Sequence, residues 1–349
     1  MQNNEPIDQT PRRARIPRIL LGALLLIVVF LAGTLLMWGT SWKIPRAAIA
    51  SSGYQLVGYW VGADLPGGKF DRPMGIAVAP TGDVYVVDAR KRVVRWGATG
   101  EFKVEWGRDG KGPGEFSNPV DVAVAPDGSV YVSDYDQDRV QKFTTEGKFL
   151  RQFGRSGTGG GEFDAPAGLA VDGAGAVYVA DFYHHRIQKF SADGTWQKVI
   201  GHPGRIGDGA LHYPTGVHAS ADGHLLVADA YNYQLQRFAP DGRPAGRLGN
   251  HLFWLWPRPT DSAAGFNAPT GVAVGPGGVM HVADSGNHRV VMLSENGEYL
   301  AEWRIPAADP GIYSPTKIAV SPDGRMIYAT DYAADRIIVL KVAGPPDGK

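Results

Sequence analysis

The chain has 349 residues, and its 35 basic and 35 acidic side chains give a formal net charge of zero at pH 7. This balance leaves no electrostatic footprint for nucleic acid, and we expect no nucleic-acid partner. The lack of cysteine excludes disulfides, thiolate catalysis and cysteine-ligated zinc. The high contents of glycine (47) and proline (25) are typical of short strands joined by tight turns.

An uncharged apolar segment runs from Ile19 to Trp38, and its 20 residues are enough to cross the roughly 30 Å hydrocarbon core of a bilayer as a helix. Four arginines precede it within residues 12–18, whereas Lys43 and Arg46 follow it. The excess of positive charge before the segment places the N-terminus in the cytoplasm. We therefore expect a single-pass protein of the bacterial inner membrane, with its main domain in the periplasm.

A cleaved signal peptide is the alternative, with Ala48, Ile49 and Ala50 as the small-residue cleavage site. The length of the apolar segment and the charges that follow it favour an uncleaved anchor. The expected organisation is a basic N-terminus (1–18), a transmembrane helix (19–38), a linker (39–53), a repeat domain (54–341) and a C-terminal tail (342–349).

Six similar units fill the repeat domain. Each contains a Pro-x-Gly-Val-Ala-Val-like segment, an Asp-Gly-like turn, a Val-Tyr-Val-x-Asp-like segment and an Arg-Val-x-x-Phe-like segment. The aspartates that end the third element recur at spacings of 46, 47, 48, 55 and 47 residues. A fixed period of this length marks supersecondary units that cannot each bury a core alone.

Within one unit the hydrophobic pattern has the period of strands. In the second unit, alternating segments at 120–124 and 130–132 flank a turn, and further strands are expected at 140–143 and 148–153. Four-stranded units repeated radially form a β-propeller. The sixth unit lacks its outer strand, so we expect Tyr54–Trp60 to complete that last blade. The sequence thus predicts an all-β, six-bladed propeller preceded by one transmembrane helix.

Two segments carry a family resemblance: Gly112–Pro119 (GPGEFSNP) and Asp284–Val290 (DSGNHRV). They resemble NHL repeats, and the resemblance covers roughly residues 54–341. It implies a six-bladed propeller. It does not imply one function, because the family includes enzymes, RNA binders, ubiquitin-ligase substrate domains and sensor domains of bacterial receptor kinases.

A repeated Asp-x4-Arg pair spans the loop between the second and third strands, as in Asp134 and Arg139. An acid and an arginine across a short loop could form a catalytic pair. A reaction needs one site, however, and this pair recurs in nearly every unit. We therefore interpret it as a charge-assisted brace of the scaffold.

The residues after each repeat proline should line the mouth of the central channel, and we single out those that break the six-fold pattern. They are Asp121, Thr215, Thr270, Thr316, Lys317 and, further along its strand, His218. An enzymatic relative that the units distantly resemble, peptidyl-α-hydroxyglycine α-amidating lyase, holds zinc with histidines at this ring. Those histidines are missing here, and one carboxylate is too few for a calcium cage. We expect no metal and no cofactor.

Two interpretations of these outliers remain open. Asp121 and Lys317 either compensate each other or polarise a small ligand. His218 stands where the other five units have alanine, and a lone histidine in such a place is more often a hydrogen-bonded buried residue than a catalyst.

Aromatic residues are concentrated in the loops of one quadrant, which we expect to share one face. The connection after the fourth unit is long and apolar, and it either binds a partner or folds back on the ring. The candidate binding residues are Tyr135, Phe182, Tyr183, His184, His185, Tyr231, Tyr233, Phe253, Trp254, Trp256 and Arg258.

These observations favour a membrane-anchored binding or scaffold module over an enzyme. The partner would be a protein, a peptide or a glycan, or the chain would be an accessory subunit of a membrane complex. The alternative is a periplasmic lyase or hydrolase that works at the channel mouth.

Overall fold

The computed structural model describes residues 53–249, 265–305 and 315–343. Internal contacts divide the chain into residues 1–50 and 51–349, and everything described belongs to the second unit. The predicted transmembrane segment and the long connection with Trp254 and Trp256 lie outside the described residues.

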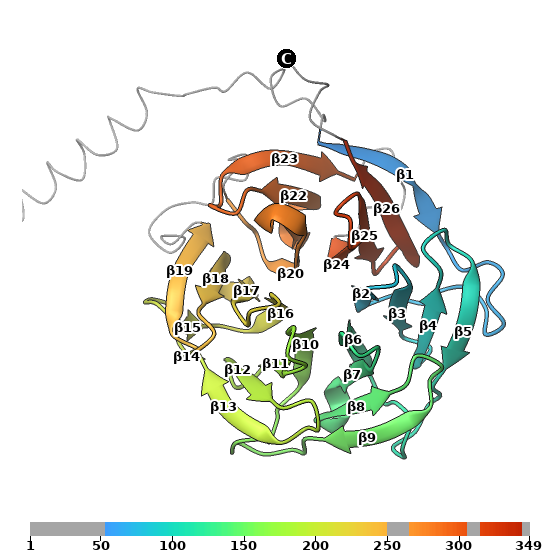
Figure 1. Cartoon of the computed structure of the whole chain (residues 1–349), viewed down its shortest axis with the longest axis horizontal. Coiled ribbons are helices and arrows are strands. Elements are labelled where there is room, and N and C mark those ends of the chain that lie inside the picture. Colours follow the sequence, from blue (N-terminus) through green and yellow to red (C-terminus); the bar gives the residue numbers. More distant parts are fainter. Residues whose placement is uncertain (1–52, 250–264, 306–314, 344–349) are drawn as a thin grey trace, which may run out of the picture. The chain divides into compact units, whose positions relative to one another are not determined.

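Six four-stranded antiparallel sheets form the domain and stand as blades around a common centre (Figure 1). Blade one consists of β2 (Ile76–Val78), β3 (Val84–Asp88), β4 (Arg92–Trp96) and β5 (Phe102–Trp106). Blade two consists of β6 (Pro119–Val124), β7 (Val130–Asp134), β8 (Arg139–Phe143) and β9 (Phe149–Phe153). Blade three consists of β10 (Pro166–Val171), β11 (Val177–Asp181), β12 (Arg186–Phe190) and β13 (Trp196–Ile200). Blade four consists of β16 (Pro214–Ala219), β17 (Leu225–Asp229), β18 (Gln234–Phe238) and β19 (Pro244–Gly249). Blade five consists of β20 (Pro269–Val274), β21 (Met280–Asp284), β22 (Arg289–Leu293) and β23 (Tyr299–Arg304). Blade six consists of β24 (Pro315–Val320), β25 (Met326–Asp331), β26 (Arg336–Val342) and β1 (Tyr54–Trp60).

Short elements occupy the connections between these strands. A two-stranded parallel pair joins blades three and four, formed by β14 (His202–Pro203) and β15 (Ala210–Leu211). Single 3-10 turns are η2 (Tyr135–Gln137), η3 (Ala230–Asn232), η4 (Pro276–Gly278) and η5 (Ser285–Asn287). The predicted tight turns are present too: Gly128, between β6 and β7, has a φ of 85°, a left-handed conformation that glycine adopts without steric cost.

The last blade is closed by the N-terminal strand, as the sequence predicts. β1 pairs antiparallel with β26, and Tyr54 lies opposite Val342. The Tyr54 hydroxyl lies 2.7 Å from Nδ1 of His281, a buried residue of blade five. β1 therefore completes its own blade and also attaches to the preceding one, which leaves the ring no open seam.

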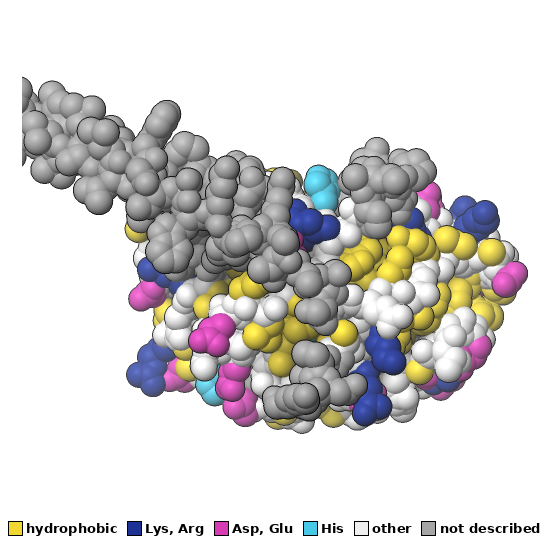
Figure 2. All heavy atoms as spheres, turned by 90° about the horizontal axis from the view of Figure 1, so that it is seen from above, with side chains coloured by type: hydrophobic (Ala, Val, Ile, Leu, Met, Phe, Trp, Pro, Cys, Tyr) yellow, Lys and Arg dark blue, Asp and Glu magenta, His cyan; other side chains and the backbone are white. Residues whose placement is uncertain are grey.

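The hydrophobic core lies between neighbouring blades because strand side chains alternate between the two faces of each sheet. One cluster joins Tyr85 and Val87 of blade one to Val122 and Val130 of blade two. On the side of the ring seen in Figure 2, charged side chains of both signs are interspersed with hydrophobic ones. This agrees with the balanced charge of the sequence.

Candidate functional site

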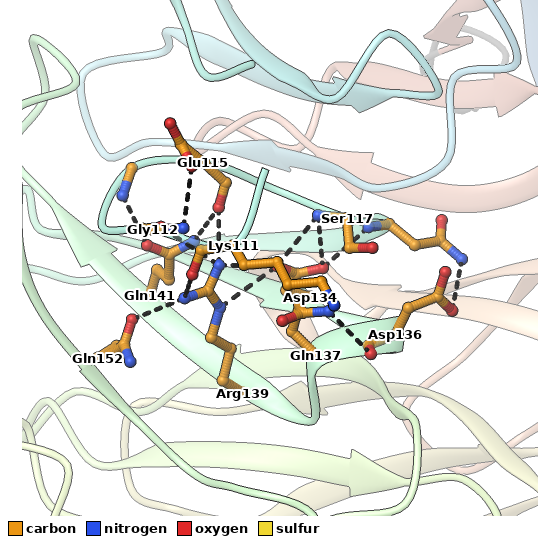
Figure 3. A network of polar contacts seen from close by, with 12 residues as sticks. Lys111, Gly112, Glu115, Ser117, Asp134, Asp136, Gln137, Arg139, Gln141 and Gln152 are labelled. Carbon is orange, nitrogen blue, oxygen red and sulfur yellow. Dashed lines mark hydrogen bonds and ion pairs between the residues drawn. The ribbon is translucent and has the colours of Figure 1, made fainter. Parts of the chain in front are cut away.

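The repeated aspartate–arginine pair is a scaffold brace, as predicted. In blade two, the Asp134 carboxylate accepts hydrogen bonds from Arg139 Nη2 (3.2 Å) and from the backbone N–H of Asn118 (2.8 Å). Arg139 also donates to the carbonyl of Glu115 (2.9 Å) and to Gln152 Oε1 (2.9 Å). Figure 3 shows this network, in which the arginine ties the loop before the blade to its outer strand.

Equivalent pairs occupy the other blades at N–O distances of 2.7–3.1 Å: Asp88 with Arg92, Asp181 with Arg186, Asp284 with Arg289 and Asp331 with Arg336. In blade four Gln234 replaces the arginine and donates to Asp229 (2.9 Å). Burial raises the pKa of Asp134 and of Asp229. Each carboxylate is buried and bonded to its arginine or glutamine, so the pairs hold loops rather than meet a substrate.

The loops after the second strands and the connections between blades lie on one face, as predicted. The backbone N–H of Tyr135 donates to the carbonyl of Asn118 (2.9 Å), and that of Tyr231 donates to the carbonyl of His212 (3.2 Å). The turns η2 and η3 are therefore each bonded to the connection that enters their own blade. Aromatic residues from both kinds of loop can meet on this face.

Seven rings from blades two to four form a continuous series of contacts there, which we call the aromatic–histidine cluster. Phe182 connects Tyr135 to Tyr213, with centroid separations of 6.2 and 4.8 Å. Tyr213 in turn contacts Tyr231 at 4.9 Å. The members are Tyr135, Phe182, Tyr183, His185, His212, Tyr213 and Tyr231.

Two histidines are stacked inside this cluster. The rings of His185 and His212 lie 5.0 Å apart at an interplanar angle of 24°. His185 Nδ1 accepts the backbone N–H of Tyr213 (3.0 Å), so its proton resides on Nε2. Burial lowers the pKa of both imidazoles; His184 and Arg205 lower that of His185 further, and Arg205 and His185 lower that of His212 further. Both rings are therefore neutral at pH 7.

The cluster is a surface rather than a core. The side chains of Tyr183 and Tyr231 are 48% and 50% exposed, whereas Tyr135, Phe182 and Tyr213 are half-buried beneath and between them. Exposed phenol rings supported by half-buried aromatic rings form an amphipathic surface that offers both apolar area and hydroxyl groups. This combination is suited to contact with another molecule.

The structure brings together five of the residues predicted for the binding face and separates others. Tyr135, Phe182, Tyr183, His185 and Tyr231 are in the cluster, whereas His184 bonds the scaffold carboxylate Asp181 (3.0 Å). Tyr233 is not among the ring contacts of the cluster; it ends η3 in a left-handed conformation. Phe253, Trp254, Trp256 and Arg258 lie outside the described residues.

The repeat pattern does not mark two members of the cluster, His212 and Tyr213. They directly precede the repeat proline of blade four, a position taken by unrelated residues in the other units. Tyr213 has a φ of 55°, and Arg72 and Ala268 share this left-handed conformation at the equivalent position. The two aromatic side chains directly before this proline are the sequence feature that could have added His212 and Tyr213 to the predicted binding face.

At the channel mouth, Asp121 and Lys317 compensate each other. The ammonium Nζ of Lys317 lies 2.8 Å from Asp121 Oδ2 and 2.6 Å from the carbonyl oxygen of Thr215. Asp121 Oδ2 also accepts the backbone N–H of Leu169 (3.0 Å). The pair thus joins blades two, three, four and six, and burial is the first cause of the raised pKa of Asp121.

The other predicted mouth residues do not converge with this pair on one catalytic site. The hydroxyl of Thr215 donates to the carbonyl of Pro269 (3.3 Å), and that of Thr270 donates to the carbonyl of Thr316 (2.7 Å), so both link neighbouring blades. His218 lines the wall of the channel on the far side of the pair. Across the ranges that the structure describes, no three histidine or acidic side chains come close enough to hold a metal ion.

Comparison with known proteins gives the following similarities. Residues 116–143, 163–190, 211–238 and 266–292 match the NHL repeat family. NHL repeat-containing protein 3 of Homo sapiens is 32% identical over 98 residues, which cover 28% of this chain and 27% of that protein. The chain therefore aligns with about a quarter of that relative's length.

Three solved structures share the fold at low sequence identity. A streptogramin B lyase structure has a TM-score of 0.56 at 16% identity and covers 84% of this chain and 99% of its own. Kuenenia stuttgartiensis hydrazine synthase has a TM-score of 0.55 at 17% identity, and the match covers 78% of this chain and 96% of that one. A nidogen/laminin complex has a TM-score of 0.56 at 16% identity, and the match covers 71% of this chain and 84% of that one. These likenesses support the architecture, and the matched segments coincide with blades two to five: the chain is a six-bladed β-propeller that carries NHL repeats.

Proposed function

We propose that this protein is a membrane-anchored, extracytoplasmic binding module whose aromatic–histidine cluster binds a protein or peptide partner. The observation that carries the proposal is the continuity of the cluster across three neighbouring blades, with Tyr183 and Tyr231 half exposed at its surface. Tyrosine is enriched at protein interfaces because a rigid ring contributes a large contact area together with a polar hydroxyl.

The cluster is also held in place before any partner arrives. The backbone of Tyr183 donates to the carbonyl of Asp164 (3.2 Å), and the backbone of Tyr213 is fixed by His185. Rings on such anchored loops lose little conformational entropy on binding, which favours affinity.

The membrane anchor rests on the sequence of residues 19–38 and on the arginines that precede it. Among the residues that the structure describes, no helix is long and apolar enough to span a bilayer, and segment 19–38 is not among them. In this proposal the linker 39–53 holds the propeller close to the outer surface of the inner membrane.

The binding proposal is tested by affinity purification of the full chain in mild detergent. The double variant Tyr183→Ala/Tyr231→Ala should lose the partners that the wild type retains. Trp196→Ala is the matched control, because Trp196 is an exposed aromatic residue (42%) on the outer strand β13, outside the cluster. If the double variant retains the same partners as the control, the cluster is not the binding surface.

The anchor has its own test in washed membranes. An anchored chain should stay in the membrane fraction after alkaline carbonate extraction and should begin at its original N-terminus. A mature protein that begins at Ser51 and is released by the wash would contradict the anchor while leaving the binding proposal standing.

A further inference from the structure

The centre of the ring contains a cavity of about 700 Å³ on the side of the Asp121–Lys317 pair away from the aromatic–histidine cluster. Its walls are the inner strands of all six blades, and the turns that follow these strands form its mouth. Its innermost layer consists of the aliphatic residues Ile76, Val122, Leu169, Val217, Val272 and Ile318. Cavities that bind small molecules have this size and are mostly apolar.

The Asp121–Lys317 pair lies one residue along its strands from the innermost layer of this cavity. Lys317 reaches from blade six to Asp121 in blade two and to the Thr215 carbonyl in blade four. At the same level the inner strands nearly touch: a Cβ on Gly75 would lie 2.4 Å from Cα of Asp121. The cavity therefore ends at this level and opens toward the opposite face.

One histidine interrupts the aliphatic wall. The layer above the innermost one consists of Ala77, Ala123, Ala170, Ala273, Ala319 and, in blade four, His218. No hydrogen bond to the His218 side chain is present within the described ranges. His218 is partly exposed in this wall, so its ring nitrogens can form hydrogen bonds with a group that occupies the cavity.

Neighbouring positions in blade four are smaller than in the other blades and leave room around this imidazole. Ala219 occupies a position that is valine in the five other units. Leu226, the cross-strand partner of His218, replaces a ring that is tyrosine in four units and histidine in one. Burial lowers the pKa of His218 to about 4, so the imidazole is neutral at pH 7 and can both donate and accept.

We propose that this cavity binds a neutral, largely apolar small molecule whose single polar group forms a hydrogen bond with His218. Charged ligands are disfavoured because the charges of Asp121 and Lys317 are already paired, and Asp172, the acidic residue in the lining, is already bonded to Tyr178 and to the backbone of Ala176. The site lies on the other face of the ring from the aromatic–histidine cluster and is independent of the proposed partner binding.

The test uses the full chain in detergent, labelled with ¹⁵N-histidine and titrated with 1-adamantanol, a compact apolar molecule with one hydroxyl group. The imidazole signals of His218, identified by their loss in His218→Ala, should shift and saturate. 1-Adamantanamine has the same cage but is a cation at pH 7, and it should cause no saturating shift. No saturation with the alcohol, or equal saturation with the amine, would overturn the proposal.

Variants locate the binding. Ala77→Trp places a large ring in the His218 layer and should abolish binding, with Val320→Trp as a second blocking variant; both original residues are partly exposed in the wall. In His218→Ala, affinity measured by equilibrium dialysis should fall roughly 2- to 10-fold through loss of one hydrogen bond. Trp196→Ala, on the outer strand β13 and outside both sites, is the control and should bind as the wild type does.

Unchanged His185 and His212 signals report that each variant is folded. Wild-type affinity in a folded blocking variant would overturn the assignment of the site. Wild-type affinity in His218→Ala would overturn the role of the imidazole.

Discussion

The ammonium group of Lys317 lies 2.8 Å from the carboxylate of Asp121, although 196 positions separate the two residues in the chain. Hydroxyl side chains accompany this pair on the neighbouring strands: Ser133 accepts the backbone N–H of Asp121 (3.1 Å), and Thr330 accepts that of Lys317 (2.9 Å). Both hydroxyls donate in turn to a carbonyl of the next blade. The pair is thus built into the closure of the ring.

Breaking this pair should destabilise the propeller. We expect Lys317→Met to reduce the free energy of unfolding by about 3–5 kcal/mol, because it leaves a buried carboxylate without its counter-charge. The double variant Asp121→Asn/Lys317→Met should lose less than the sum of the two single variants. Urea unfolding of all four proteins measures the coupling, and strictly additive losses would contradict a paired role.

Two histidines that the fold holds neutral, buried His281 and partly exposed His218, should make stability depend on acid pH. Burial lowers the pKa of His218 and of His281 from 6.5 to about 4. Between these values the unfolded chain binds protons that the folded chain does not, so stability falls as the pH drops from about 6.5 to 4. Each residue contributes roughly 3 kcal/mol to this loss.

The comparison that isolates one residue is wild type against His218→Ala, in urea unfolding at pH 7, 5 and 4. The stability of the variant should decline less steeply over this range. Parallel curves for the two proteins would show that His218 is not held neutral by the fold.

The Tyr54 hydroxyl of the closing strand β1 should contribute measurably to the stability of the ring. Tyr54→Phe removes the hydrogen bond to His281 and leaves a buried ring nitrogen without this partner. We expect a loss of about 1–3 kcal/mol. The double variant Tyr54→Phe/His281→Phe, which leaves neither polar group, should recover part of that loss in thermal unfolding, and no recovery would argue against the bond.

The scaffold brace should tolerate glutamine better than alanine. Arg139→Ala leaves buried Asp134 without its charged donor and should cost about 3–5 kcal/mol. Arg139→Gln restores the donor found in blade four, where Gln234 bonds Asp229, and should cost less. Urea unfolding ranks the two variants, and equal losses would contradict a hydrogen-bonding role.

The ring could be predicted from the sequence because the residues that define each blade recur at a nearly fixed spacing. The repeated prolines and aspartates predict four strands per unit, and the absent outer strand of the last unit predicts the pairing of β1 with β26. The Asp121–Lys317 pair could be anticipated as well, because both residues occupy the same ring position, which holds glycine in the other units.

The candidate binding face could be predicted only in part. Tyr183 and Tyr231 follow the scaffold aspartates at fixed offsets and therefore stand out in the repeat. His212 and Tyr213 lie in a connection whose sequence differs between units, so spacing gives no sign that they stack on His185. Nor does the pattern indicate that His184 bonds Asp181, because that depends on the direction of a side chain.

Site-specific photo-cross-linking in living cells tests the proposed binding face most directly. A benzophenone amino acid is placed at position 231 in one protein and at position 222 in another. Tyr231 is in the aromatic–histidine cluster, whereas Asp222 is exposed in the turn between β16 and β17 of the same blade, on the opposite face. We predict a discrete cross-linked species from position 231 and none from position 222. Equal cross-linking at both positions, or none at position 231, would contradict the account.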